Sequence, residues 1–396
     1  MRAGGGVPEP GDLVSAVYRV LLAAFFAGMG MSLSWLFLNF HLEAIGFSRT
    51  LVGFANATPA LSLVVLGVPL GFWLPRWGYV RSLWGGAGLA AAGLGLVAWA
   101  PLASLVFVGL VIYGVGNAML MGAQAPLLTR LVPQERRVLV FSWQGALTTG
   151  AGFFGNLAGG WLPRWLGGPA EALGVAAALF ALTLLPLWGL RPEGRGDRRV
   201  GRVRHAALWA RLLLPILVIS LGAGLIMPFL NLYLSEKFNL AYATVGALFA
   251  FSSLATMAAM LIQPRLAARF GKLGAIVISQ AASLPFILVL AYVPYLPLVA
   301  LAMFVRGALM NAATPVYTAL AMDLLPEEER AAFMLVEGAL WQAGWAVGSA
   351  VSGRIQEALG LAAFDYLFAG MLLLYALATL LFPLLLGREQ GARVLE

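Results

Sequence analysis

The chain has 396 residues, of which 61% are hydrophobic and only 11% are charged, with a net charge of +8. A soluble domain needs roughly 25% charged residues to cover its surface, so the composition excludes an ordinary water-soluble protein and indicates that lipid surrounds much of this one. Cysteine is absent and the two histidines, His41 and His205, are far apart, which excludes disulfides and cysteine metal sites and predicts no metal centre.

The apolar run that begins near Tyr18 is too long for the core of a cleavable signal peptide and predicts the first membrane helix. Because a bilayer core of roughly 30 Å needs about 20 helical residues, the chain divides at charged and Pro/Gly-rich points into twelve such runs. Their approximate bounds are 18–42, 50–74, 82–100, 103–130, 137–163, 171–190, 209–234, 243–264, 273–292, 297–324, 328–356 and 363–386.

The basic residues are distributed unevenly between the loops. Of 25 Lys and Arg residues, 20 lie near the termini or in one set of loops, and one, Arg306, lies inside a span. The other set of loops holds only Arg49, Arg164, Lys237 and Arg354. By the positive-inside rule this bias predicts that both termini and the 191–208 loop lie in the cytoplasm. We expect a multi-pass protein of a bacterial plasma (inner) membrane.

The segment 191–208 is Arg/Gly-rich and has no apolar face, which predicts a cytoplasmic linker between a six-helix bundle over 1–190 and another over 209–396. It is expected to be a solvated loop, with binding of anionic lipid as the alternative.

An internal repeat supports this division. When the chain is aligned with itself at a shift of 193 residues, glycine, proline and arginine residues of the two halves coincide. A shift of 192 aligns Phe37-Leu38-Asn39 with Phe229-Leu230-Asn231. The pairs at 193 include Gly53/Gly246, Arg76/Arg269, Gly78/Gly271, Gly114/Gly307, Pro133/Pro326, Gly155/Gly348 and Gly160/Gly353. Six spans per half give the repeats the same orientation, and parallel repeats that meet around a midplane site are one of the secondary-transporter architectures.

The loop after the second span carries a family motif. It contains Gly71, Arg76, Gly78 and Arg81, and its partner in the second half contains Arg269, Gly271 and Lys272. Both stretches resemble the major facilitator superfamily signature G-x-L-a-D-R-x-G-R. The resemblance implies an all-α fold of twelve transmembrane helices in two bundles related by a pseudo-two-fold axis, and it makes these residues candidates for a cytoplasmic gate.

Two features depart from the family pattern. The acidic residue of the signature is Pro75 in one half and Ala268 in the other. The acidic run 327–329 is expected to complement the positive start of the eleventh helix, with pairing to Arg76 or Arg81 as the alternative. In the fifth span, residues 155–160 are similar to the end of the antiporter motif of proton-driven exporters, with Asn156 in place of Pro, and they equally fit a small-residue packing seam.

Ionisable side chains in a membrane are candidates for function, because they are costly there. Arg306 and Glu337 each lie about nine residues inside their spans, roughly 14 Å from opposite surfaces, so both are expected near the midplane. Their repeat partners, Tyr113 and Gln144, are polar but uncharged. A pair between Arg306 and Glu337, static or made and broken during a cycle, is predicted.

Glu337 is followed by Trp341 and Trp345 on the same helix face. A carboxylate beside indole rings suits an organic cation, which favours proton-coupled export of amphipathic or cationic compounds. Alternatively, Arg306 anchors a polar anion or a sugar. The remaining candidates for a substrate cavity are Trp35, Asn39, Tyr113, Asn117, Gln124, Gln144, Asn231 and Tyr317.

Other function classes fit less well. The sequence has no paired carboxylates and no metal spacing, which argues against a membrane-embedded enzyme, and charge in only one of two repeats does not make a symmetric channel filter. We expect no cofactor beyond a proton gradient, no nucleic-acid partner, and a monomer that binds a small-molecule substrate within the lipid bilayer.

Overall fold

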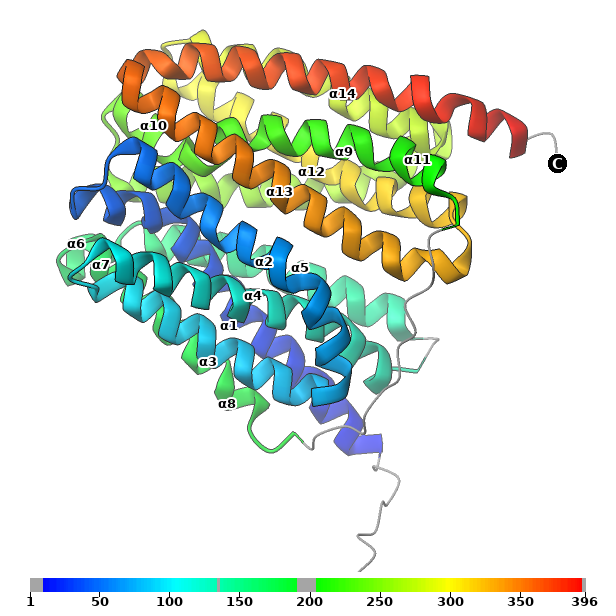
Figure 1. Cartoon of the computed structure of the whole chain (residues 1–396), viewed down its shortest axis with the longest axis horizontal. Coiled ribbons are helices and arrows are strands. Elements are labelled where there is room, and N and C mark those ends of the chain that lie inside the picture. The colour runs from blue at the N-terminus through cyan, green and yellow to red at the C-terminus, as the bar shows by residue number, and fades with distance from the viewer. Residues whose placement is uncertain (1–9, 134–135, 191–203, 394–396) are drawn as a thin grey trace, which may run out of the picture.

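The computed structural model describes residues 10–133, 136–190 and 204–393, and the described residues form helices and no strands (Figure 1). The first half comprises α1 (Pro10–Ala44), α2 (Arg49–Trp77), α3 (Tyr79–Trp99), α4 (Ala103–Leu131), α5 (Arg137–Gly159), α6 (Leu162–Leu166), α7 (Pro169–Leu182) and α8 (Leu184–Leu187). The second half comprises α9 (Ala206–Ile226), η2 (Met227–Phe229), α10 (Leu230–Phe238), α11 (Tyr242–Tyr292), α12 (Leu296–Leu324), α13 (Glu327–Leu359), η3 (Gly360–Ala362) and α14 (Ala363–Arg393).

These helices correspond to the twelve predicted spans. In lipid every backbone N–H and C=O must find its partner within the segment, and a helix achieves this. The seventh span is α9, η2 and α10 in succession, because Pro228 has no N–H and interrupts the helical ladder. The long helix α11 contains two spans, since Gly271 adopts φ 73° and breaks it.

Ten stretches of the described helices are long and apolar enough to cross a membrane. Two predicted spans do not register separately: α5 is not among the ten, and α13 and α14 fall into one stretch over 332–387. Helix α5 carries the polar residues Gln144, Thr148, Thr149 and Asn156, and it packs on α1 of its own half and on α11 of the other half.

The equivalent glycines of the repeat make equivalent turns. Gly78 has φ 96° between α2 and α3, and Gly271 has φ 73° at the corresponding point of α11. Only glycine adopts this region of the backbone without strain. The glycine of the signature is therefore required by the sharp turn that joins two adjacent spans in each half.

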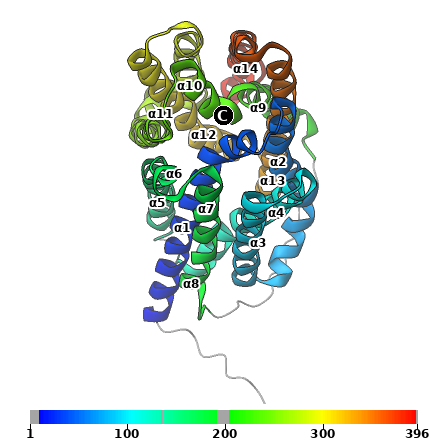
Figure 2. The ribbon, with the colours of Figure 1, turned by 90° about the vertical axis from the view of Figure 1, so that its left-hand side faces the viewer.

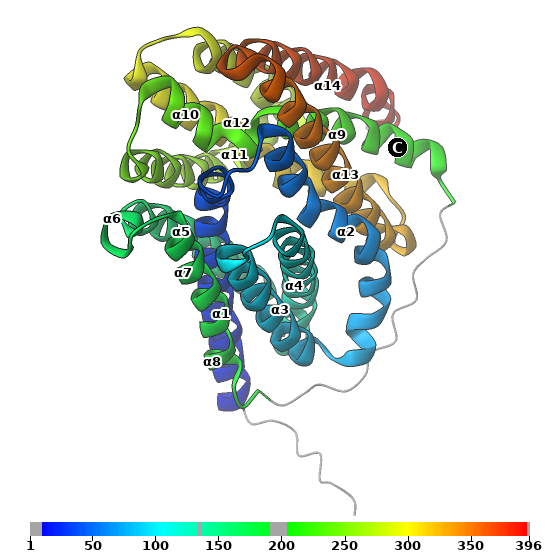
Figure 3. The same ribbon diagram turned by 60° about the vertical axis from the view of Figure 1, so that its left-hand side comes forward.

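The helices pack in two groups. In the first half α1 packs on α5 and α7, and α3 packs on α4 and α7; in the second half α9 packs on α13 and α14, and α11 packs on α12 and α14. Figures 2 and 3 show these groups side by side. Between the groups, α2 packs on α13 and α5 packs on α11. The linker boundary at 191–208 stays a prediction, since 191–203 lie outside the described residues.

The two ends of the molecule differ in how the halves meet. We call the end that carries Arg76, Arg81 and Arg269 the basic end, and the opposite end, which carries Arg49 and Glu236, the far end. The equivalent helices α1 and α9–α10 meet near the far end and run wide apart at the basic end (Figures 1 and 3). Arg49 binds Glu236 across the halves at the far end. The structure thus has its far end closed.

Glu329 joins the start of α9 to the start of α13. It lies in the first turn of α13, near the end of the linker, and it is buried. Its carboxylate accepts hydrogen bonds from the Arg204 backbone N–H (3.0 Å), from His205 Nδ1 (2.8 Å) and from Trp209 Nε1 (2.7 Å). Glu329 therefore pairs with the end of the linker rather than with Arg76 or Arg81.

This cluster predicts a pH dependence of stability. Burial opposes the charge of Glu329, but the hydrogen bonds from His205, Trp209 and Arg204 outweigh it and hold the pKa of Glu329 below its ordinary value. A carboxylate with a depressed folded-state pKa stabilises the fold above its ordinary pKa, about 4.5, and this contribution is lost as the pH falls through the folded-state value.

We therefore expect the melting temperature of the purified protein to fall as the pH drops below about 4.5, and Glu329→Gln to show a smaller fall. At neutral pH the variant should melt several degrees below the parent, measured by intrinsic fluorescence in detergent. Glu171→Gln, in the first turn of α7, is the control and should keep the full pH dependence. An equal acid-induced fall in Glu329→Gln and the parent would contradict this assignment.

Candidate substrate and coupling site

Glu337 lies in the first half of α13, with its side chain half-buried. It makes no hydrogen bond and no ion pair with the residues that the structure describes. The charge of Glu337 acts on the hydroxyl of Tyr317 on α12, which is buried and donates to Leu212 O (3.2 Å). A membrane acid without a counter-charge is free to bind a proton or a cation.

Arg306 lies in α12 and points into the second half, where it is 7% exposed. Its Nη2 donates to Tyr375 Oη (2.7 Å), its Nη1 contacts Met227 Sδ (2.9 Å), and the guanidinium lies 5.3 Å from the Tyr375 ring centroid. Arg306 Nε has no hydrogen-bond partner in the part of the chain that the structure describes. The predicted static pair with Glu337 is absent in this conformation, because Arg306 binds α14 and η2 instead.

Two tryptophans from opposite halves meet beside this region. Trp35 of α1 and Trp345 of α13 have ring centroids 5.3 Å apart, and Trp35 remains 49% exposed. Trp341, one turn from Trp345 toward Glu337, is half-buried. One face of α13 therefore presents Glu337, Trp341 and Trp345 in sequence, with Trp35 of the first half against the last of them.

The repeat places a neutral copy of the acid site in the first half. Gln144 of α5 donates to Gln124 of α4 at 3.2 Å. A shift of 193 converts this pair into Glu337 and Tyr317. The equivalent positions are thus polar in both halves, with a hydrogen bond between them in the first half and a charge in the second half only.

Other predicted cavity residues lie elsewhere. Tyr113, the counterpart of Arg306, is buried against Phe180 in the first half, with ring centroids 5.9 Å apart. Asn117 contacts only Met121 Sδ of its own helix, at 3.8 Å. Asn39 and Asn231 are 1% and 2% exposed, so neither amide is open to a substrate in this state.

The gate residues predicted from the signature lie at the basic end. Arg76 ends α2, Arg81 is in the first turn of α3, and both are exposed. Arg269 is exposed and lies over the Phe270 ring at 5.3 Å. Gly71 lies within α2. Their role as a cytoplasmic gate stays a prediction.

The glycines of the fifth span pack against other helices. A Cβ on Gly155 would lie 3.1 Å from Met29 O of α1, and a Cβ on Gly160 would lie 2.8 Å from Ala243 Cα of α11. Of the two interpretations of residues 155–160, the packing seam describes what they do in this structure.

Two successive stretches of the chain, residues 20–215 and 212–395, match the family model described as Major Facilitator Superfamily. The chain belongs to the Major Facilitator Superfamily. The two matches, one for each half, agree with the repeat found in the sequence. No individual curated protein matches the chain.

Solved transporters of this superfamily have the same fold. A bacterial homologue of the human lysosomal transporter Spinster, inward-facing and occupied, has a TM-score of 0.78 at 14% identity over 96% of this chain and 97% of that one. A mutant of the nucleoside transporter NupG has a TM-score of 0.74 at 16% identity over 93% and 99%. The peptide transporter POT in complex with sulfate has a TM-score of 0.72 at 14% identity over 97% and 96%.

Family and fold together make the chain a multi-pass membrane transporter rather than an enzyme. The fold supports secondary transport by alternating access, in which two bundles rock around a central site. The substrates named for the similar structures are chemically diverse, so they do not define the substrate of this chain.

Sequence reasoning missed several contacts of the site. Met227 and Tyr375, which hold Arg306, were not singled out, because a thioether and a phenol in apolar spans look like ordinary packing residues. The repeat offered a signal for Met227, since its counterpart at a shift of 193 is Ser34, beside Tyr113. Asn56, which donates to Asn39 Oδ1 at 2.7 Å, was also missed.

Proposed function

We propose that this transporter exports amphipathic organic cations from a bacterial cell in exchange for protons, with Glu337 as the group that binds either one. The observation that carries the proposal is the half-buried carboxylate of Glu337, which has no cationic partner among the described residues. In a low-dielectric setting such an acid takes up a proton or a positively charged ligand.

The aromatic residues around Glu337 support the choice of an organic cation. Trp341 and Trp345 extend the same face of α13, and Trp35 adds a half-exposed indole from the other half. An indole face attracts a cation by about 0.5–2 kcal/mol, and it also accepts the apolar part of an amphipathic molecule. A sugar or a small inorganic anion would gain little from these rings.

Competition at a single carboxylate provides the coupling. When Glu337 holds a proton it has no charge for a cation, and when it holds the cation the proton has left. If the bundles rock readily only when Glu337 is occupied, each cycle moves one ligand out and the other in. The neutral counterpart Gln144 has no proton to exchange, so the exchange is confined to the second half.

The direction and setting are part of this proposal. The arginine bias predicts that the basic end faces the cytoplasm, so a structure closed at the far end is inward-facing and ready to take up substrate from inside. Each chain holds a complete pair of bundles, and we propose that it works as a monomer in the plasma membrane.

The test is proton movement in liposomes that contain the purified protein, a pH-sensitive dye and an imposed pH gradient. Lipophilic cations, organic anions and sugars are added in turn, with empty liposomes as the control. The proposal predicts dye signals with cations only. Signals with anions or sugars and none with cations would overturn it.

A second candidate function rests on Arg306. This guanidinium is buried, and among the described residues it contacts no carboxylate and its Nε has no partner, so it has capacity left to bind an anion. If anions or sugars are transported, Arg306→Lys should reduce their uptake about tenfold or more, because an ammonium cannot bond Tyr375 and an anion in the same geometry. Glu337→Gln should then leave transport unchanged.

A further inference from the structure

Asn39 of α1 and Asn231 of α10 hold the two halves together near the far end. Asn39 Nδ2 donates to Asn231 Oδ1 (2.9 Å) and to the Pro228 carbonyl, and Asn231 Nδ2 donates to the Leu36 carbonyl (2.8 Å). We call these two amides with their two carbonyl acceptors the asparagine clasp. Its hydrogen bonds cross from one half to the other, so opening the far end requires their rupture.

The clasp is reciprocal under the sequence repeat. A shift of 192 residues converts Asn39 into Asn231 and also converts Leu36 into Pro228. Each asparagine therefore donates to the carbonyl three residues before its counterpart. This is the pattern of an isologous contact, in which two equivalent surfaces meet across a two-fold axis. The clasp thus lies where the pseudo-two-fold axis of the repeat passes between α1 and the seventh span.

The break in the seventh span prepares one side of the clasp. In a continuous helix the Leu232 N–H would bond the Pro228 carbonyl. Here the Leu232 N–H donates to Asn231 Oδ1 at 2.9 Å, which leaves the Pro228 carbonyl for Asn39. On the other side, Asn56 of α2 donates to Asn39 Oδ1 at 2.7 Å and orients that amide.

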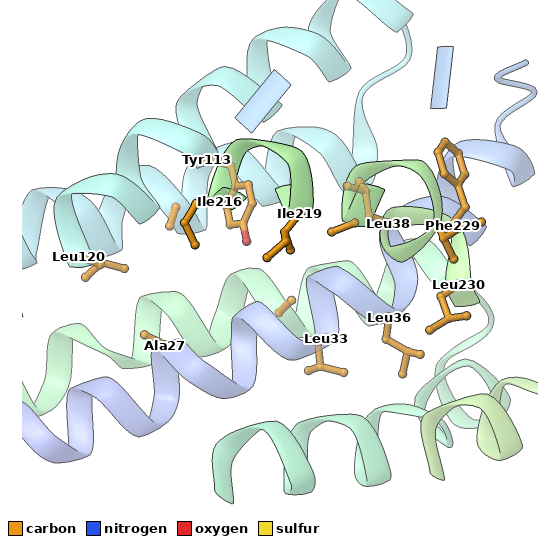
Figure 4. Close-up of a cluster of buried hydrophobic side chains, with 14 of the residues drawn as sticks. Ala27, Leu33, Leu36, Leu38, Tyr113, Leu120, Ile216, Ile219, Phe229 and Leu230 are labelled. Atoms are coloured by element: carbon orange, nitrogen blue, oxygen red, sulfur yellow. The ribbon is translucent and has the colours of Figure 1, made fainter. Parts of the chain in front are cut away.

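Apolar residues surround the clasp. Leu36 and Leu38 of α1 and Phe229 and Leu230 of the seventh span are buried in the cluster drawn in Figure 4. An amide buried in such surroundings must have its hydrogen bonds satisfied, because an unpaired polar group there is costly. The contact therefore favours one arrangement of the halves and disfavours partial separation.

We propose that the asparagine clasp is the latch of the far-end-closed state, and that Asn39 and Asn231 govern the balance between the two access states rather than substrate contact. The Pro228 carbonyl accepts from Asn39. Arg306 of α12 contacts Met227, the residue before Pro228, so α12 also supports this break in the seventh span. The inference rests on alternating access and not on which ligand is transported.

The test uses pairs of spin labels, which the cysteine-free chain makes straightforward. One pair replaces exposed Ile45 and Leu361 with cysteine at the far end, and a second pair replaces exposed Leu185 and Leu384 at the basic end. Distances are measured in lipid nanodiscs without substrate for the parent, Asn39→Ala and Asn231→Ala. Asn311→Ala is the control, because the Asn311 amide bonds only Gly307 O of its own helix (2.8 Å).

We expect each clasp variant to raise the ratio of far-end-open to far-end-closed molecules on the order of tenfold, because each loses interhelical hydrogen bonds at once. The far-end pair should lengthen and the basic-end pair should shorten. The double variant should open no further than the single ones, since both act on one contact. Asn311→Ala should match the parent.

Distance distributions in Asn39→Ala and Asn231→Ala that match the parent would overturn the proposal, whatever happens to their melting temperatures. Should either variant fail to accumulate in the membrane, Asn56→Ala gives the same answer, because it removes only the donor that orients Asn39. In Asn56→Ala we expect the far end to open to an extent between the parent and the clasp variants. A far-end distance that matches the parent would contradict the latch. Absence of proton coupling in the liposome assay would leave this result untouched.

Discussion

Glu337→Gln is expected to abolish substrate-driven proton movement, leaving less than about a few per cent of the parent signal. Glutamine keeps the size and the hydrogen-bonding capacity of the side chain, but it binds no proton and attracts no cation. The measurement is the dye assay in liposomes with a lipophilic cation that gives a signal with the parent protein.

The size of the effect follows from the position of Glu337. No other acid was found inside the spans near the midplane, and the described structure shows no cation beside this one. A variant that still binds substrate through Trp341 and Trp345 should retain exchange of unlabelled for labelled substrate without a gradient. Loss of proton movement together with retained exchange would show that Glu337 is needed for proton coupling and not for substrate binding.

Two controls make this result specific. Glu171→Gln removes a carboxylate from the first turn of α7, away from the site, and should couple like the parent. Gln144→Glu adds an acid at the equivalent position of the first half, and it should not restore coupling to Glu337→Gln if the second half alone carries the exchange. Normal proton movement in Glu337→Gln would show that another group couples transport.

Gly53→Val and Gly246→Val are each expected to reduce transport at least tenfold by keeping the halves apart at the far end. These glycines correspond in the repeat, and each lies at a crossing between the halves. A Cβ on Gly53 of α2 would lie 2.7 Å from Ser349 O of α13, and a Cβ on Gly246 of α11 would lie 2.5 Å from Asn156 O of α5.

The obstacle at both crossings is backbone, which cannot swing aside like a flexible side chain. The partner helices also present glycine at these points, Gly353 opposite Gly53 and Gly160 opposite Gly246. Overpacking costs roughly 1–3 kcal/mol where neighbours can adjust, which corresponds to about a fivefold to 150-fold loss of the far-end-closed state. Uptake of labelled substrate and the far-end spin-label pair report the two consequences.

Gly95→Val is the matched control, because Gly95 of α3 has no atom near the position of an added Cβ. It should transport and open like the parent. Full transport in both Gly53→Val and Gly246→Val, with an unchanged far-end distance, would show that these crossings are not closed during the cycle.

Two sets of glycines show what could be predicted from the sequence: those in the turns of the signature, and those at the helix crossings between the halves. Gly78 and Gly271 were expected in a turn of the signature, and both have the positive φ that only glycine tolerates. Gly53, Gly160, Gly246 and Gly353 appeared in the sequence as coincidences of a repeat. Their use as two equivalent helix crossings depends on how α2 meets α13 and how α5 meets α11, which no local pattern encodes.

For the candidate site, too, the sequence predicts which residues matter but not which contacts they make. Charge inside a span is visible in any hydropathy reading, so Arg306 and Glu337 were found at once. Helical rise gives the depth of each residue in the membrane, but it does not define the direction in which the side chain points. Arg306 turns into its own bundle toward Tyr375, and Glu337 stays half-exposed near Tyr317.

The amino-acid sequence alone predicts a membrane protein with twelve helical spans in two repeated halves and a resemblance to the Major Facilitator Superfamily, and the family match confirms the resemblance. The composition, the internal repeat of glycine, proline and arginine residues, and a short signature suffice for this prediction, because lipid allows few backbone structures. The folded structure adds that Asn39 and Asn231 bind each other and that Arg306 binds Tyr375 instead of Glu337. These contacts join residues 192 and 69 positions apart. They arise from the relative placement of rigid helices, which depends on the packing of the whole chain in one access state.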